Sequence, residues 1–173
     1  MIRSMRTRAA VAGSSVFFAA APGVVAGLVP WALTGWEGAD PPWPLPVRAA
    51  GGVLLAACAV VLVQAFARFV REGRGTPAPV GPTERLVVGG LYRHVRNPMY
   101  VAVVGAIVGQ ALLLGRPVLL VYAAAAGAAM WAFVRGYEEP VLTARYGDEY
   151  LAYRRAVPGW VPRLRPWTPD AAA

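Results

Sequence analysis

The chain has 173 residues, of which 57% are hydrophobic and 15% charged, a charge content well below that of ordinary soluble domains. Its net charge of +8 comes from 17 arginines without any lysine, but these flank long uncharged stretches, which argues against a basic face for nucleic acid. One cysteine and one histidine exclude an intrachain disulfide and a metal site built from several such ligands.

The first predicted membrane span covers about residues 9–33, which contain no charged side chain. A helix needs about 20 mainly apolar residues to cross the hydrocarbon core of a bilayer. Three arginines precede the stretch, as at the start of a secretory signal peptide, but its length favours a helix that is retained. We expect Pro22 and Pro30 to kink this helix or to end it.

Three further apolar segments are predicted, at about residues 47–66, 98–114 and 118–134. The turn around Arg116 is short, so the last two segments should form an antiparallel hairpin, and their length favours tilting or local thinning of the bilayer. An amphipathic helix follows at about residues 143–156. The sequence therefore predicts an all-α fold, a polytopic membrane helical bundle of about four transmembrane helices plus a C-terminal amphipathic helix.

The distribution of arginines predicts the orientation of this bundle. The N-terminus before the first span holds three, region 67–97 holds six, and the chain after residue 134 holds six. Only Arg48 and Arg116 lie in the two connections on the opposite side. Because basic residues gather on the cytoplasmic side, we expect four spans with both termini cytoplasmic, in a membrane such as the bacterial inner membrane.

In this topology the hairpin brings two polar regions together, residues 84–100 and the segment that begins at Arg135. Taken singly, their residues have ordinary explanations: arginines that reach the headgroups, and Asn97 capping a helix that begins at Pro98. Glu138 and Glu139 are harder to explain, because adjacent carboxylates beside an apolar span are costly unless water or a cation receives them. A helix N-terminus on the facing wall suits an anion, so a zwitterionic ligand would fit.

Two sequence blocks carry a family resemblance. Residues 90–100, Gly-Leu-Tyr-Arg-His-Val-Arg-Asn-Pro-Met-Tyr, and residues 138–142, Glu-Glu-Pro-Val-Leu, resemble the signature of the isoprenylcysteine carboxyl methyltransferase and phospholipid methyltransferase superfamily. So do residues 145–153 and Val157-Pro158. The chain is then expected to be a single membrane methyltransferase domain, 1–173, with an N-terminal two-helix part at 1–70 and a family-like, cofactor-binding half at 83–162.

The resemblance implies an all-helical integral membrane enzyme that binds S-adenosyl-L-methionine without a Rossmann domain, and no glycine-rich βαβ fingerprint is present. Many members have histidine where this chain has Asn97, which keeps a hydrogen-bond donor but removes a titratable ring. By position in the motifs, the cofactor would be held by Leu86, Val87, Tyr92, Asn97, Pro98, Met99, Tyr100, and Glu138 or Glu139.

The candidate catalytic residues are Arg135, Glu138, Glu139 and His94. A carboxylate acceptor would need no general base, whereas an amine or phenol would need a group such as His94 to take a proton. Arg135 could recruit an anionic acceptor or reach toward the headgroups. The expected partners are the lipid bilayer and a lipophilic small-molecule or lipidated substrate, with no nucleic acid and no metal. Phospholipid N-methylation, of a phosphatidylethanolamine-type headgroup, and a non-catalytic membrane scaffold are the alternatives.

Overall fold

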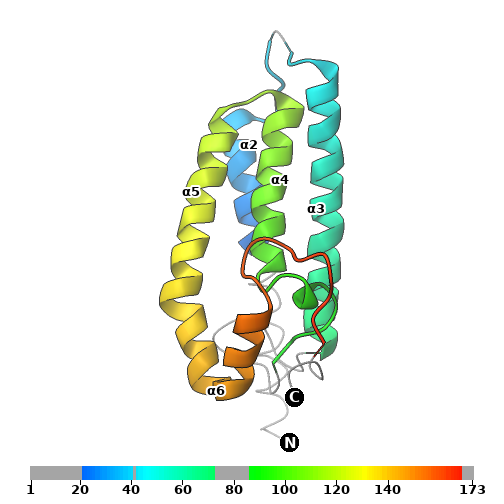
Figure 1. The fold of residues 1–173 in the computed structure, drawn as a ribbon. Helices are drawn as coiled ribbons and strands as arrows, with labels where there is room; N and C mark the ends of the chain where they lie inside the picture. The colour runs from blue at the N-terminus through cyan, green and yellow to red at the C-terminus, as the bar shows by residue number, and fades with distance from the viewer. Residues whose placement is uncertain (1–20, 41, 73–85, 169–173) are drawn as a thin grey trace, which may run out of the picture.

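A computed structural model of the chain describes residues 21–40, 42–72 and 86–168, and within these ranges all regular secondary structure is helical. Helices α2 to α5 run side by side as a bundle, and the remaining elements gather at one end of it (Figure 1). The predicted all-α class is therefore confirmed. The elements are η1 (Val24–Leu28), α2 (Val29–Thr34), α3 (Leu45–Glu72), η2 (Gly90–Arg93), α4 (Pro98–Leu114), α5 (Val118–Phe133), η3 (Val134–Glu138) and α6 (Glu139–Ala156).

Two stretches are long and apolar enough to cross a membrane, Leu45–Ala65 and the continuous helix Val118–Ala156, whose apolar part is α5. Ala21–Thr34 and Pro98–Leu114 are shorter apolar helices. The third predicted segment has the same bounds as α4, and the fourth differs from α5 by one residue. The second predicted segment agrees within two residues with the apolar stretch Leu45–Ala65, and α3 continues beyond it to Glu72.

The first predicted span lies partly outside the described residues, but its last part forms the helix Ala21–Thr34. This helix does not end at Pro22 or Pro30, although proline cannot donate a backbone hydrogen bond to the preceding turn. Side chains of neighbouring helices supply donors there: Tyr122 Oη donates to Val25 O at 2.9 Å, and Gln110 Nε2 donates to Ala26 O at 2.7 Å. Because these carbonyls have partners, the helix passes through Pro30 by way of the π-helical turn η1.

Helices α3 and α4 approach each other through glycines. A Cβ atom on Gly51 would lie 2.5 Å from the Leu113 backbone nitrogen and 2.7 Å from Gly109 O. A Cβ atom on Gly105 would lie 2.6 Å from Cys58 Sγ. Small residues thus let the two backbones meet, as is usual between helices in membranes, and fix α4 and its N-terminus against α3.

The C-terminal helical region differs from its prediction. Helix α6 begins at Glu139 and not near Thr143, because η3 continues α5 without a break and Pro140 is compatible with a first helical turn. Gly147, with φ +51° and ψ −127°, then interrupts α6. The chain turns there and its second half returns beside the end of the bundle (Figure 1). We call the region formed by η3 and the two halves of α6 the elbow.

Residues 157–167, which we call the tail, lie along the segment that precedes α4. Backbone hydrogen bonds join Arg96 N to Pro158 O at 2.9 Å and Arg163 N to His94 O at 2.9 Å. Trp167 N donates to Arg93 O at 3.0 Å. These bonds fix the tail at the same end of the bundle as η2 and α6, where Figure 1 shows the three segments together.

Candidate functional site

Asn97 precedes the first residue of α4, as predicted, but its side chain does not cap the helix. Its backbone N–H donates to Gly159 O of the tail at 3.2 Å, while its buried Nδ2 atom has no hydrogen-bond partner. A buried donor without a partner costs about 1–3 kcal/mol. The side chain therefore leaves a buried amide donor without a partner among the described residues, which the cap interpretation did not predict.

Tyr100, one turn further along α4, contacts both the elbow and the tail. Its hydroxyl donates to Glu138 Oε2 at 3.2 Å, and its ring stacks on Trp160 of the tail with 6.3 Å between centroids. Burial raises the pKa of the Glu138 carboxyl, which the nearby charge of Glu139 raises further, although the Tyr100 hydrogen bond opposes both effects. Asn97, Tyr100, Glu138 and Trp160 thus combine a buried amide donor without a partner, a carboxylate and two aromatic rings. We call these four residues the motif cluster.

Glu139 has a different environment from its neighbour. It is only 5% exposed, and its Oε1 atom lies 2.9 Å from Arg96 Nη1. Its Oε2 atom lies 3.2 Å from an Arg154 nitrogen and 3.6 Å from an Arg135 nitrogen. Arg96 is held further by Tyr150 Oη at 3.0 Å and by the Val157 carbonyl at 3.0 Å. Both oxygens of Glu139 are therefore engaged, and it ties the start of α4 to the elbow.

His94 and Arg135, the other candidate catalytic residues, lie in separate places. His94 Nδ1 lies 2.8 Å from Arg163 O, and since a carbonyl oxygen only accepts, Nδ1 carries the hydrogen. The neutral ring then presents Nε2 as a base. The Arg135 side chain is 53% exposed and lies over the Trp131 ring, 6.0 Å from its centroid. The structure does not bring these two side chains together.

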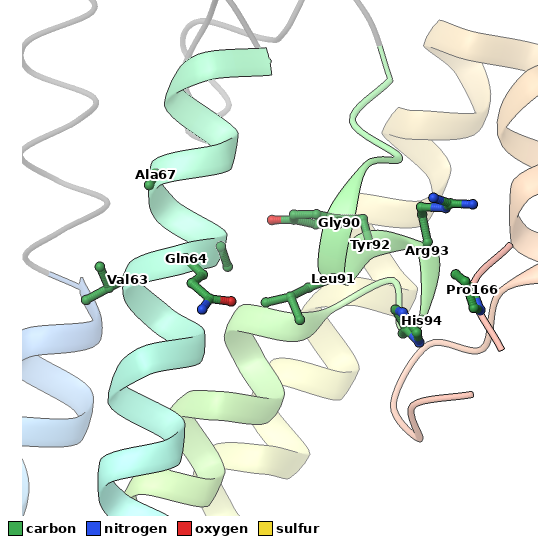
Figure 2. Close-up of a pocket in the computed structure, with 10 residues that line it drawn as sticks. Val63, Gln64, Ala67, Gly90, Leu91, Tyr92, Arg93, His94 and Pro166 are labelled. Carbon is green, nitrogen blue, oxygen red and sulfur yellow. The ribbon is translucent and has the colours of Figure 1, made fainter. Parts of the chain in front are cut away.

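A cavity of about 710 Å³ lies between α3 and η2 (Figure 2). Its volume falls within the roughly 300–1,000 Å³ typical of small-molecule sites. Figure 2 shows the Gln64 amide directed toward Leu91, with His94 beside Pro166 at the far wall. Sequence reasoning missed Gln64, although a lone amide inside an apolar span was a usable signal. The lining residues are Val63, Gln64, Ala65, Ala67, Gly90, Leu91, Tyr92, Arg93, His94 and Pro166.

A second cavity, of about 420 Å³, lies between α3 and α4, and Leu91 and His94 line it as well. Its other lining residues are aliphatic, proline or glycine residues apart from Cys58. A polar and an apolar cavity thus share Leu91 and His94 at their boundary. Such a pair suits a ligand with a polar reactive group and a hydrocarbon chain.

The other residues predicted to hold the cofactor are buried or packed around the segment that leads into α4. Tyr92 is buried, lines the larger cavity, and accepts a hydrogen bond from Tyr153 Oη at its carbonyl oxygen, at 2.6 Å. Val87, Pro98 and Met99 are buried. Leu86 packs against the buried cluster of Tyr150, Tyr153 and Val157.

Comparison with known proteins gives one family. Residues 47–149 match the family model described as phospholipid methyltransferase, which is more than half of the chain. The matched range contains three residues of the motif cluster, Asn97, Tyr100 and Glu138, and ends before the tail. No curated protein matches the chain.

Proposed function

Because the chain belongs to the phospholipid methyltransferase family, in the superfamily of integral membrane methyltransferases, we propose that it uses S-adenosyl-L-methionine to methylate a lipophilic acceptor. The family implies a membrane methyltransferase. The observation that carries the choice of cofactor is the motif cluster, where α4, η3 and the tail meet.

The residues of the cluster fit the chemistry of this cofactor. S-adenosyl-L-methionine has a sulfonium, an ammonium, a carboxylate and an adenine ring. Glu138 is suited to a cationic group, and the rings of Tyr100 and Trp160 can attract one. Asn97 Nδ2 can donate to an acceptor atom. We assign the cofactor to Glu138 and not to Glu139, because both oxygens of Glu139 already lie against arginines.

Bound cofactor would supply a methyl group on a positively charged sulfur. The acceptor nucleophile would attack the methyl carbon in line with the carbon–sulfur bond, and the sulfur would leave as a neutral thioether. The protein has to align the acceptor and exclude water. The tail helps to exclude water, because its backbone hydrogen bonds with residues 93–97 hold it over the start of α4. His94 lines both cavities and is held at Nδ1, so its Nε2 can take a proton from an amine or phenol acceptor. A carboxylate acceptor would not need this step.

The apolar cavity between α3 and α4 supports a lipophilic acceptor, since aliphatic lining is suited to a hydrocarbon chain. We propose an acceptor of the isoprenylcysteine carboxyl type, a lipid-linked carboxylate. A phospholipid amine is the competing acceptor, to which the description of the matching family points. The arginine asymmetry supports a site on the cytoplasmic surface of a four-span protein with both termini cytoplasmic, as in a bacterial inner membrane.

A methyl-transfer assay tests this function. Purified protein in lipid nanodiscs, given S-adenosyl-L-methionine labelled in the methyl group and membrane lipid extracts, should label a lipid-soluble product. Base-labile label would identify a methyl ester, and base-stable label an N-methylated amine. Glu138→Gln should abolish most transfer, whereas Glu149→Gln, the same change at an exposed position of α6, should not. Absence of transfer with bacterial extracts of both lipids and lipidated proteins would contradict the proposal.

A further inference from the structure

An open hollow of about 440 Å³ lies within the elbow, away from the motif cluster. Its charged lining consists of Arg135, Arg154 and Glu139, and no other acidic side chain of the described residues lines it. Pro140, Thr143 and Ala144 complete the lining.

The charges in and behind this hollow do not balance. The carboxylate of Glu139 faces three guanidinium groups, those of Arg96, Arg135 and Arg154, at 2.9, 3.6 and 3.2 Å. Arginine stays protonated at any physiological pH, so these four groups carry two positive charges in excess. The neighbouring Glu138 carboxylate, whose charge interacts with Arg96 and Glu139, reduces this excess to one when it is ionised. Arg96 and Glu139 are largely buried and neutralise each other, so the excess lies on Arg135 and Arg154, whose side chains line the hollow and are 53% and 36% exposed. Salt screens these exposed charges in part. The hollow therefore favours an anion.

The fold brings the second arginine to this place. Glu139 and Arg154 are fifteen positions apart, which on a straight helix would separate them by about 22 Å. The turn at Gly147 reduces the distance between their charged atoms to 3.2 Å. Arg135, from η3, completes the site from the other wall. Two guanidinium groups on facing walls can contact the oxygens of one phosphate.

The hollow lies at the depth of the lipid headgroups. Arg135 follows the last residue of the apolar helix α5 by two positions. Trp131, whose ring lies under Arg135, is 53% exposed. Phe133 and Tyr137 of the same helical stretch are also exposed and contact each other with 5.3 Å between ring centroids. Exposed aromatic residues at the end of an apolar helix mark the membrane–water interface. The anions concentrated at that depth are the phosphates of anionic phospholipids.

We propose that the elbow binds one anionic phospholipid of the surrounding bilayer, whose phosphate lies between Arg135 and Arg154. This lipid is a bound partner and not the methyl acceptor, so the site holds whether or not the chain transfers methyl groups. In this proposal the exposed Arg135 side chain binds the lipid phosphate and does not act in methyl transfer.

Native mass spectrometry of the detergent-purified protein tests the site, with phosphatidylglycerol or phosphatidylcholine added stepwise. The wild type should hold one phosphatidylglycerol more tightly than phosphatidylcholine. The variant Arg135→Gln/Arg154→Gln should bind phosphatidylglycerol about tenfold more weakly, the equivalent of 1.4 kcal/mol. Arg155→Gln is the matched control, because Arg155 is adjacent and exposed but does not line the hollow. It should bind as the wild type does.

Three results would overturn the proposal: unchanged phosphatidylglycerol binding in the folded double variant, equal binding of both lipids, or displacement of the lipid by an equal concentration of inorganic phosphate. The last would identify a site for a soluble anion. If the double variant unfolds, Arg135→Gln alone decides, because Arg96 and Arg154 still neutralise Glu139. It should weaken lipid binding about threefold, or roughly 0.6 kcal/mol, and unchanged affinity would contradict the site.

Discussion

The bundle and the polar end of this molecule are held together by different means. In the bundle, α3 and α4 meet at Gly51, Gly105 and Gly109, and the hydrogen bonds of each helix are mostly its own. At the polar end, η2, the elbow and the tail are joined by hydrogen bonds and ion pairs between segments 40 to 75 residues apart, such as Arg96 to Glu139 and Trp167 to Arg93.

The fold thus relies on close backbone packing in the bundle and on charge pairing at the polar end. The close backbone contact of the bundle leaves few polar groups to bind anything, but it fixes where α4 begins. At that fixed start lie the unpaired amide of Asn97 and the hydroxyl of Tyr100, which donates to the Glu138 carboxylate of η3. Variants of the bundle should therefore lose stability, whereas variants of the polar end should lose stability, cofactor binding or both.

The largest loss of stability is expected for Glu139→Gln at the polar end. The change removes the carboxylate between three arginines and leaves the largely buried Arg96 without its counter-charge. Breaking a buried ion pair in this way costs about 3–5 kcal/mol, and the exposure of the other two arginines favours the lower figure. Thermal unfolding in detergent measures the loss, with Glu149→Gln as the control. A cost as small as that of the control would show that Glu139 does not hold this end together.

In the bundle, Gly51→Ala should cost nearly as much. Its new Cβ would lie 2.5 Å from backbone nitrogen of Leu113, so the helices must separate, at a cost toward the upper end of about 1–3 kcal/mol. Gly52→Ala is the matched control, since the nearest neighbour of its new Cβ would be a side-chain carbon of Leu113 at 3.8 Å, an ordinary contact. If both alanine variants melted alike, the close approach of α3 and α4 would be refuted.

A smaller loss, about 1 kcal/mol, is expected for Gln110→Leu. Gln110 is a buried polar residue of the bundle: its Nε2 donates to Ala26 O and its Oε1 accepts from Trp36 Nε1 at 3.2 Å. Leucine leaves both groups without this partner. Tyr122→Phe should add a comparable loss, because it removes the donor to Val25 O. If both variants melted at the temperature of the wild type, the helix around Pro30 would not need the side-chain hydrogen bonds from α4 and α5.

The smallest effect concerns pH at the polar end. Burial raises the pKa of the Glu138 carboxyl, so it takes up its proton at a higher pH than an ordinary glutamate does. Protonation removes the negative charge that would hold the cationic cofactor, so affinity for S-adenosyl-L-methionine should fall as the pH is lowered from neutral. We expect a change of less than about tenfold before the protein acid-denatures. Glu138→Gln should remove this dependence, and an identical pH profile in that variant would exclude Glu138 as its source.

Sequence reasoning succeeded where the determining signals are local. Pro98 and Gly115 set the bounds of α4 correctly, because one residue starts helices and the other, with φ +69°, ends them. Predictions from the sequence failed where contacts with distant segments determine the environment of a residue. Asn97 looked like a helix cap, but its backbone pairs with Gly159 and its amide stays open. The tail and residues 93–97 are joined through backbone atoms, which all residue types share, so the amino-acid sequence does not predict these contacts.

The adjacent glutamates show the same limit. Their sequence suggested a site but not which carboxylate serves it, because the distinction depends on Arg96, Arg154 and Tyr100 from other segments. Gln64 was overlooked for a similar reason, since only the position of η2 reveals the cavity that it lines.

Calorimetric titration of the purified protein with S-adenosyl-L-methionine tests whether the motif cluster binds this cofactor. We expect the wild type to bind it, Glu138→Gln to bind it at least about tenfold more weakly while remaining folded, and Glu149→Gln to bind it normally. A folded wild type that binds no S-adenosyl-L-methionine, or a folded Glu138→Gln variant of unchanged affinity, would contradict this expectation.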